Sequence, residues 1–155
     1  MRQSNDQKTL KKTNFLVSLK KLDELSDEVI TKIDILDLKN PSKGSIGAWN
    51  LFEIKKAIFL FKDKIKISAT LGDIFENEDF INKLEKFDDL NLDFIKFGLL
   101  SSDSKNLFDK IDILSSRVYK TNLVCVVFVD IKDNLKLVNN NLEFFIKSGL
   151  RHLML

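Results

Sequence analysis

The chain has 155 residues, of which 44% are hydrophobic and 31% are charged, and its formal net charge is +2. This composition is typical of roughly one globular domain. A small net charge of mixed sign gives no basis for a nucleic-acid partner, and no run of about 18 apolar residues is present to cross a membrane.

The only cysteine, Cys125, excludes an intrachain disulfide and favours a reducing, cytoplasmic setting. No signal peptide is visible, because residues 1–14 are polar and the apolar run that follows is too short. We therefore expect a polar N-terminal arm over residues 1–13 and one domain over residues 14–155.

Short apolar runs alternate with segments of helical periodicity along this domain. The apolar runs predict strands, and apolar residues spaced three or four apart predict helices. In chain order we expect a strand over 15–19, a helix over 22–30, a strand over 33–39 ended by Asn40-Pro41, a helix over 51–61, a strand over 65–70, a helix over 80–87, a strand over 92–98, a helix over 107–114, a strand over 123–129, a helix over 135–147 and a strand over 150–155.

Alternating helices and continuous apolar strands predict a parallel sheet covered by helices. Two α/β architectures fit this pattern, a doubly wound open sheet and a TIM-type (β/α) barrel, and the pattern alone does not separate them. A complete barrel has eight units and needs about 200 residues or more, whereas about six units are recognised here. If the fold is a barrel, it is incomplete, with about two units missing.

Two lysines, Lys39 and Lys96, stand at the ends of apolar strands. Burying a lysine cation is costly, and a lysine that loses its proton becomes a nucleophile that attacks aldehydes and ketones. A second lysine nearby favours that neutral form and can also bind phosphate. The alternative is that both ammonium groups are simply solvated at the strand ends.

Other polar residues lie near the same strand ends, where active sites of parallel α/β folds are built. Asp37 shares a strand face with Lys39, because side chains alternate along a strand. The remaining candidates are Thr70, Asp73, Gly98 and Asp130.

The segment from Gly44 to Gly47 has two readings. It can wrap an anion ahead of the next helix, or it can be a tight loop with Asn50 as the helix N-cap and Trp49 packed beside it. The single histidine, His152, excludes a histidine dyad and a histidine-rich metal site, and Cys125 is expected to be an inert core residue.

At these residues the chain resembles the (5-formylfuran-3-yl)methyl phosphate synthase family, which comprises (β/α) barrel lyases of methanofuran and methylofuran biosynthesis. The resemblance runs from about Phe15 to the end. The matching segments are DILDLKNP at 34–41, KGSIGA at 43–48, SATLGD at 68–73 and DFIKFGL at 93–99. The resemblance implies an incomplete TIM-type barrel of about six βα units.

The resemblance also implies a reaction. Two molecules of glyceraldehyde 3-phosphate would condense, with loss of phosphate and water, to the furan aldehyde 4-(hydroxymethyl)-2-furancarboxaldehyde phosphate. Lys39 would form the Schiff base, Lys96 would be the second essential lysine, and Asp37 would orient or tune Lys39. Thr70, Asp73 and Gly98 would contact substrate. No metal or cofactor is implied, and the expected partner is a small phosphorylated substrate.

The sequence departs from the family in one important respect. The family's catalytic aspartate follows its sixth strand, and this sequence ends at Leu155 before that point. We therefore also consider an inactive truncated remnant, a subunit that completes its barrel with another chain or a second copy of itself, and a different lysine aldolase.

Overall fold

The computed structural model describes residues 13–44, 46–73, 79–99, 104–117 and 119–155, so the expected N-terminal arm lies almost wholly outside the described residues. Six strands form one sheet: β1 (Leu16–Leu19), β2 (Ile35–Leu38), β3 (Lys66–Asp73), β4 (Phe94–Leu99), β5 (Asn122–Val127) and β6 (His152–Met154). The α-helices are α1 (Asp27–Ile30), α2 (Leu51–Phe61), α3 (Phe80–Asp88), α4 (Ser104–Ser115), α5 (Asn134–Asn140) and α6 (Leu142–Lys147).

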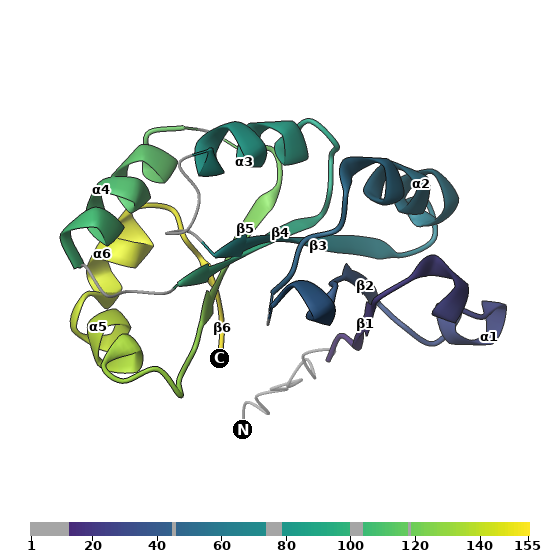
Figure 1. The fold of residues 1–155 in the computed structure, drawn as a ribbon, viewed down its shortest axis with the longest axis horizontal. Helices are drawn as coiled ribbons and strands as arrows, with labels where there is room; N and C mark the ends of the chain where they lie inside the picture. Colours follow the sequence, from purple (N-terminus) through teal and green to yellow (C-terminus); the bar gives the residue numbers. More distant parts are fainter. Residues whose placement is uncertain (1–12, 45, 74–78, 100–103, 118) are drawn as a thin grey trace, which may run out of the picture.

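All six strands run parallel, and their order in the sheet is β1-β2-β3-β4-β5-β6. In a doubly wound sheet the order in which strands are added reverses partway, and helices cover both faces. Here each strand lies beside the one before it in the chain. The helices follow one another around the outer side of a curled sheet (Figure 1). The fold is therefore an incomplete (β/α) barrel, and the doubly wound alternative is excluded.

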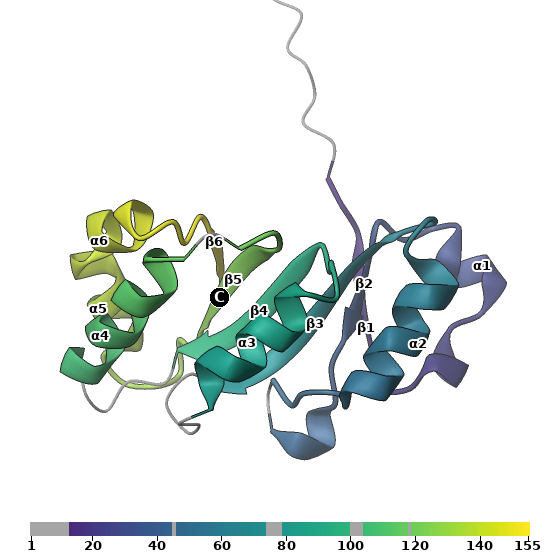
Figure 2. The same ribbon diagram turned by 90° about the horizontal axis from the view of Figure 1, so that it is seen from above.

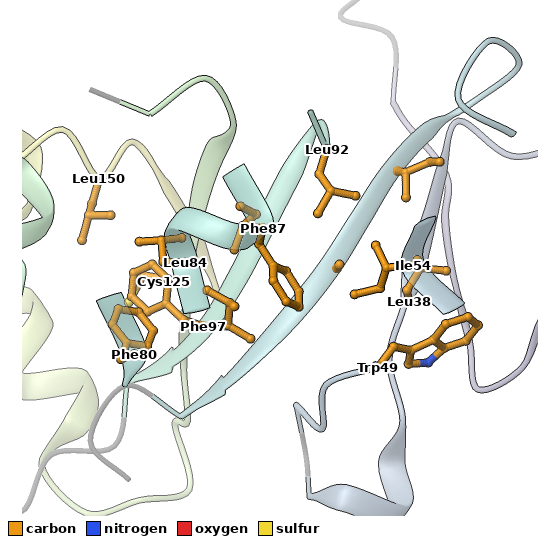
Figure 3. Close-up of a cluster of buried hydrophobic side chains, with 14 of the residues drawn as sticks. Leu38, Trp49, Ile54, Phe80, Leu84, Phe87, Leu92, Phe97, Cys125 and Leu150 are labelled. Atoms are coloured by element: carbon orange, nitrogen blue, oxygen red, sulfur yellow. The ribbon is translucent and has the colours of Figure 1, made fainter. Parts of the chain in front are cut away.

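Successive side chains of each strand point to opposite faces of the sheet. The apolar side chains of one face pack against the helices. On β4, Ile95 and Phe97 are fully buried, and Phe97 meets Phe80 of α3 edge to face at 5.7 Å between ring centroids. Helices α2 and α3 lie side by side over the strands (Figure 2). Figure 3 shows Leu84 and Phe87 of α3 directed toward the sheet. The hydrophobic core therefore occupies the layer between sheet and helices, and the opposite face of the sheet is the barrel interior.

Two of the predicted helices are interrupted. The helix expected over residues 22–30 is a 3-10 turn (Leu22–Glu24) followed by the single-turn α1, because Ser26 ends the first segment and accepts the Val29 N–H as an N-cap. The helix expected over residues 135–147 is divided into α5 and α6 at Asn141. The Asn141 side chain donates to the Leu137 carbonyl at 2.8 Å, in competition with regular helix bonding.

Three predicted strands have different ends. Strand β3 continues past Thr70 to Asp73, through a register shift beside β4 and a Gly72 at φ 98°. Strand β5 ends at Val127 and not at 129. Strand β6 begins at His152 because Leu150 still belongs to the preceding turn, where its N–H donates to the Phe145 carbonyl at 3.2 Å. Within the described residues, no helix is long and apolar enough to cross a membrane.

The packing of the core beneath α3 can be tested by measuring stability, with a matched control variant. Phe87 is 1% exposed and Phe59 on α2 is 88% exposed. Phe87→Ala should lower the free energy of unfolding by about 3–5 kcal/mol, because it removes a buried ring and leaves a cavity. Phe59→Ala should change it by less than about 0.5 kcal/mol. Urea unfolding measures both, and equal losses would contradict the packing described here.

Candidate functional site

A buried ion pair lies on the concave face of the sheet. Lys96 of β4 donates a hydrogen bond through Nζ to Oδ2 of Asp37 on β2. Asp37 is fully buried, and only 5% of the Lys96 side chain is exposed. Ser18 of β1 donates its hydroxyl hydrogen to the same Asp37 oxygen at 2.8 Å. One carboxylate oxygen thus joins side chains from three strands.

The pair depends on the curl of the sheet. Strand β3 runs between β2 and β4, so the two paired backbones lie roughly 10 Å apart. Side chains on a concave face converge, and the long lysine side chain spans the remaining distance. Ser68 of β3 is in register with Asp37, and its small side chain leaves room for the contact. The pairing therefore needs both the curvature and a small residue on the strand between.

Pairing keeps both groups charged in a place where neither charge would be stable alone. Removing two ions from water costs several kcal/mol each, and mutual attraction with further hydrogen bonds offsets that cost. The offset is incomplete, because Asp37 Oδ1 and Ser68 Oγ are buried without hydrogen-bond partners among the described residues. Both atoms lie on adjacent strands of the interior face, where a polar ligand would satisfy them.

Lys39 follows β2 and is in a different state from Lys96. It is half-buried, and its backbone N–H donates to the Leu19 carbonyl at 3.0 Å. Among the described residues, its side chain forms no ion pair or hydrogen bond. It lies two positions after Asp37, so both belong to the interior face. The Asp37 carboxylate, expected to orient or tune Lys39, is hydrogen-bonded to Lys96 and Ser18.

The other expected site residues lie on β3 and β4. Thr70 is in register with Lys96, and its hydroxyl donates to the Gly47 carbonyl at 2.8 Å, so it holds the β2–α2 loop. Asp73 is in register with the buried Gly98. The Asp73 side chain lies outside the described residues. Asp130 follows β5 and is exposed.

The β2–α2 loop is closely packed around Gly47. Its carbonyl accepts the Asn40 N–H at 2.8 Å, and an added Cβ would lie 2.1 Å from the Asn40 carbonyl oxygen. Glycine is therefore required at this position by close approach. Asn50 is the N-cap of α2, with its side chain accepting the Glu53 N–H at 2.9 Å, and Trp49 is 5% exposed in the core, as predicted.

Two interior residues, Ser18 and Ser68, were missed by sequence reasoning. Ser18 is the one polar residue of β1, Ser68 lies between apolar residues of β3, and each is in register with Asp37. A polar residue at such a position is the signal that could have identified them, since strands buried on both faces are otherwise almost continuously apolar.

Two further residues can be assigned from their surroundings. Cys125 is fully buried in the core, and burial raises its pKa to about 12, so it is an inert thiol as expected. His152 is exposed and meets Phe94 edge to face at 5.9 Å between ring centroids. Within the described part of the chain, no three His, Cys, Asp or Glu side chains gather as metal ligands would.

The ion pair can be tested with a double-mutant cycle. Asp37→Leu or Lys96→Met alone should lower the free energy of unfolding by about 3–5 kcal/mol, because each leaves one buried charge unpaired. The double variant should lose less than either single variant, because no charge is left inside. Urea unfolding of all four proteins gives the coupling energy, and strictly additive losses would rule the pairing out.

Comparison with known proteins places the chain in a family. The family model described as 4-HFC-P synthase matches residues 15–155. The chain is also similar to (5-formylfuran-3-yl)methyl phosphate synthase of Methanococcus aeolicus (strain ATCC BAA-1280 / DSM 17508 / OCM 812 / Nankai-3). The two are 27% identical over 108 residues, which cover 67% of this chain and 44% of that protein. The chain thus spans less than half of that relative's length. Because the family model covers nearly the whole sequence, the chain belongs to the 4-HFC-P synthase family.

Proposed function

We propose that this chain takes part in the synthesis of 4-(hydroxymethyl)-2-furancarboxaldehyde phosphate from two molecules of glyceraldehyde 3-phosphate. The reaction is a carbon–oxygen lyase step of methanofuran biosynthesis and proceeds through a lysine Schiff base. The observation that carries the proposal is the arrangement of Lys39, Lys96 and Asp37 on one interior face, in a chain of this family. We place the reaction in the cytoplasm, where triose phosphates are formed.

The ion pair supports a division of roles between the lysines. Lys96 Nζ is engaged by the Asp37 carboxylate, which makes it less available to attack a carbonyl. Lys39 has no such partner among the described residues, so its amine is open to substrate once it loses its proton. We assign the nucleophile to Lys39 and the charged partner to Lys96. Asp37 then acts mainly by holding Lys96 in place.

The proposed chemistry begins with addition of the Lys39 nitrogen to the aldehyde carbon. Water leaves as the carbon–nitrogen double bond forms, and the resulting cation withdraws electrons from the neighbouring carbon. That carbon loses a proton and attacks the carbonyl carbon of the second triose phosphate. The Lys96 ammonium is placed to donate a proton to the oxygen that becomes negative. Loss of phosphate and two molecules of water forms the furan ring, and hydrolysis of the carbon–nitrogen double bond then releases the aldehyde and restores the Lys39 amine.

Substrate contacts are proposed for the strand ends beside these lysines. The Thr70 hydroxyl hydrogen is engaged with Gly47, so a substrate hydroxyl would donate to its oxygen. Gly98 presents backbone without a side chain on β4, and Asp73 is in register with it. The lysine chemistry needs no metal or organic cofactor. Lysine aldolases that act on other substrates would share these features. Assaying a panel of phosphorylated and unphosphorylated aldehydes would identify the substrate class.

Reductive trapping tests the Schiff base. Incubation with glyceraldehyde 3-phosphate and borohydride should attach one stable adduct, and peptide mass spectrometry should find it on Lys39. Lys39→Arg should abolish the adduct, because a guanidinium is not a nucleophile at neutral pH. The matched control is Lys66→Arg, at the start of β3, which should be trapped as the unaltered chain is. A folded sample with no adduct on Lys39 would refute the proposal.

The edges of the sheet support a second candidate, in which another chain completes the barrel. Strands β1 and β6 are the edges of the described sheet, and each pairs on one side only. Unpaired parallel edges favour addition of further strands. We propose that a second copy of this chain or a different subunit supplies the further strands of the barrel.

Size measurement tests barrel completion. Under this candidate, size-exclusion chromatography with light scattering should give a mass well above the 17.9 kDa of one chain. The trapping reaction should weaken as dilution separates the subunits. A monomer that forms the adduct equally well at every concentration would exclude completion by a partner.

A further inference from the structure

A second basic site, with lining residues that do not include Asp37, Lys39 or Lys96, lies between the β2–α2 loop and α3. A cavity of about 440 Å³ is lined by the loop, by the end of β3 and by a side chain from α3. Its wall includes Lys43, Gly47, Trp49, Leu71 and Lys83. None of these residues has a part in the Schiff-base chemistry proposed above.

The charges in this cavity are unbalanced. Among the described residues, its lining holds two lysines, Lys43 and Lys83, and no aspartate or glutamate. Lys83 Nζ donates to the Leu71 carbonyl at 2.6 Å, which fixes the ammonium at the wall. Burial lowers the pKa of Lys83, and the nearby charge of Lys43 lowers it further. Two like charges held together in a partly enclosed place favour binding of an anion between them.

Other donors surround the same space. Helix α2 begins at Leu51, immediately after the lining residues Trp49 and Asn50. Asn50 caps the Glu53 N–H, so the first two N–H groups of the helix are those that lie outside both its own hydrogen-bond ladder and this cap. Trp49 is 5% exposed, and its indole Nε1 has no hydrogen-bond partner among the described residues. Figure 3 shows Trp49 beside Leu38 and Ile54 at this end of the core. The cavity therefore combines cationic donors with an apolar wall.

We propose that this cavity binds the phosphate group of a small phosphomonoester, with Lys43 and Lys83 as its cationic contacts. Phosphate is the anion class that matches two lysines and a helix N-terminus. The volume exceeds what a phosphate group alone fills, so Ile46, Trp49 and Leu71 would contact the organic part of the ligand. The proposal goes beyond the proposed function, since it assigns a second site with its own residues.

The single tryptophan makes the test direct, because Trp49 lines the cavity. Glycerol 3-phosphate and inorganic phosphate are titrated while tryptophan fluorescence is followed. Both should give a saturable change, and glycerol alone should give none. Lys43→Gln and Lys83→Gln should each weaken binding by about tenfold or more, the usual effect of losing one charged hydrogen bond. Affinity should also fall as salt is raised.

A matched control separates local contact from net charge. Lys56→Gln removes the same charge from an exposed position on α2 outside the cavity, and it should bind as the unaltered chain does. Circular dichroism checks that each variant is folded, and Lys43 is exposed enough for its substitution to spare the core. Glycerol 3-phosphate has no carbonyl for a lysine to attack, so the result is independent of the Schiff-base proposal. No saturable change, or equal affinity in all three variants, would overturn the site.

Discussion

The Asp37–Lys96 pair is the interaction on which the interior of this molecule depends. It joins strands that are not neighbours, so it forms only when the sheet is curled and only when the strand between carries a small side chain. The helices on the outer face favour that curl by burying one apolar set of each strand, and the pair occupies the concave side. Packing outside and charge pairing inside therefore favour the same curvature.

The same pair explains why two similar sequence positions have different chemistry. Lys39 follows β2, whereas Lys96 lies within β4 and not at its end, where the sequence pattern had placed it. A strand pattern alone treats the two lysines alike. The structure separates them by one contact, since a carboxylate holds Lys96 and leaves Lys39 without a partner among the described residues. The two lysines therefore have different surroundings, although the sequence pattern presents them alike.

The layer order was predictable because continuous apolar runs such as that of β5 fit only a sheet covered by helices. Local hydrogen bonds were harder to foresee. The Asn141 side chain divides a periodic helix, and Ser26 shortens another, although neither changes the apolar spacing. The position of Lys39 after a strand was predictable, whereas the pattern placed Lys96 at a strand end and the structure places it within β4. The partner of Asp37 was not predictable, because spacing along one strand favours Lys39, and only the curl of the sheet brings Lys96 closer.

The packing around Gly47 has a consequence for how ligands would be recognised. The Gly47 carbonyl accepts hydrogen bonds from the Asn40 N–H and from the Thr70 hydroxyl on β3, and at Gly47 there is no space for a methyl group. A loop already fixed in this way loses little conformational entropy when a molecule binds to it. It also keeps a constant span between the strand ends and the start of α2. A fixed distance between two elements favours ligands of matching length.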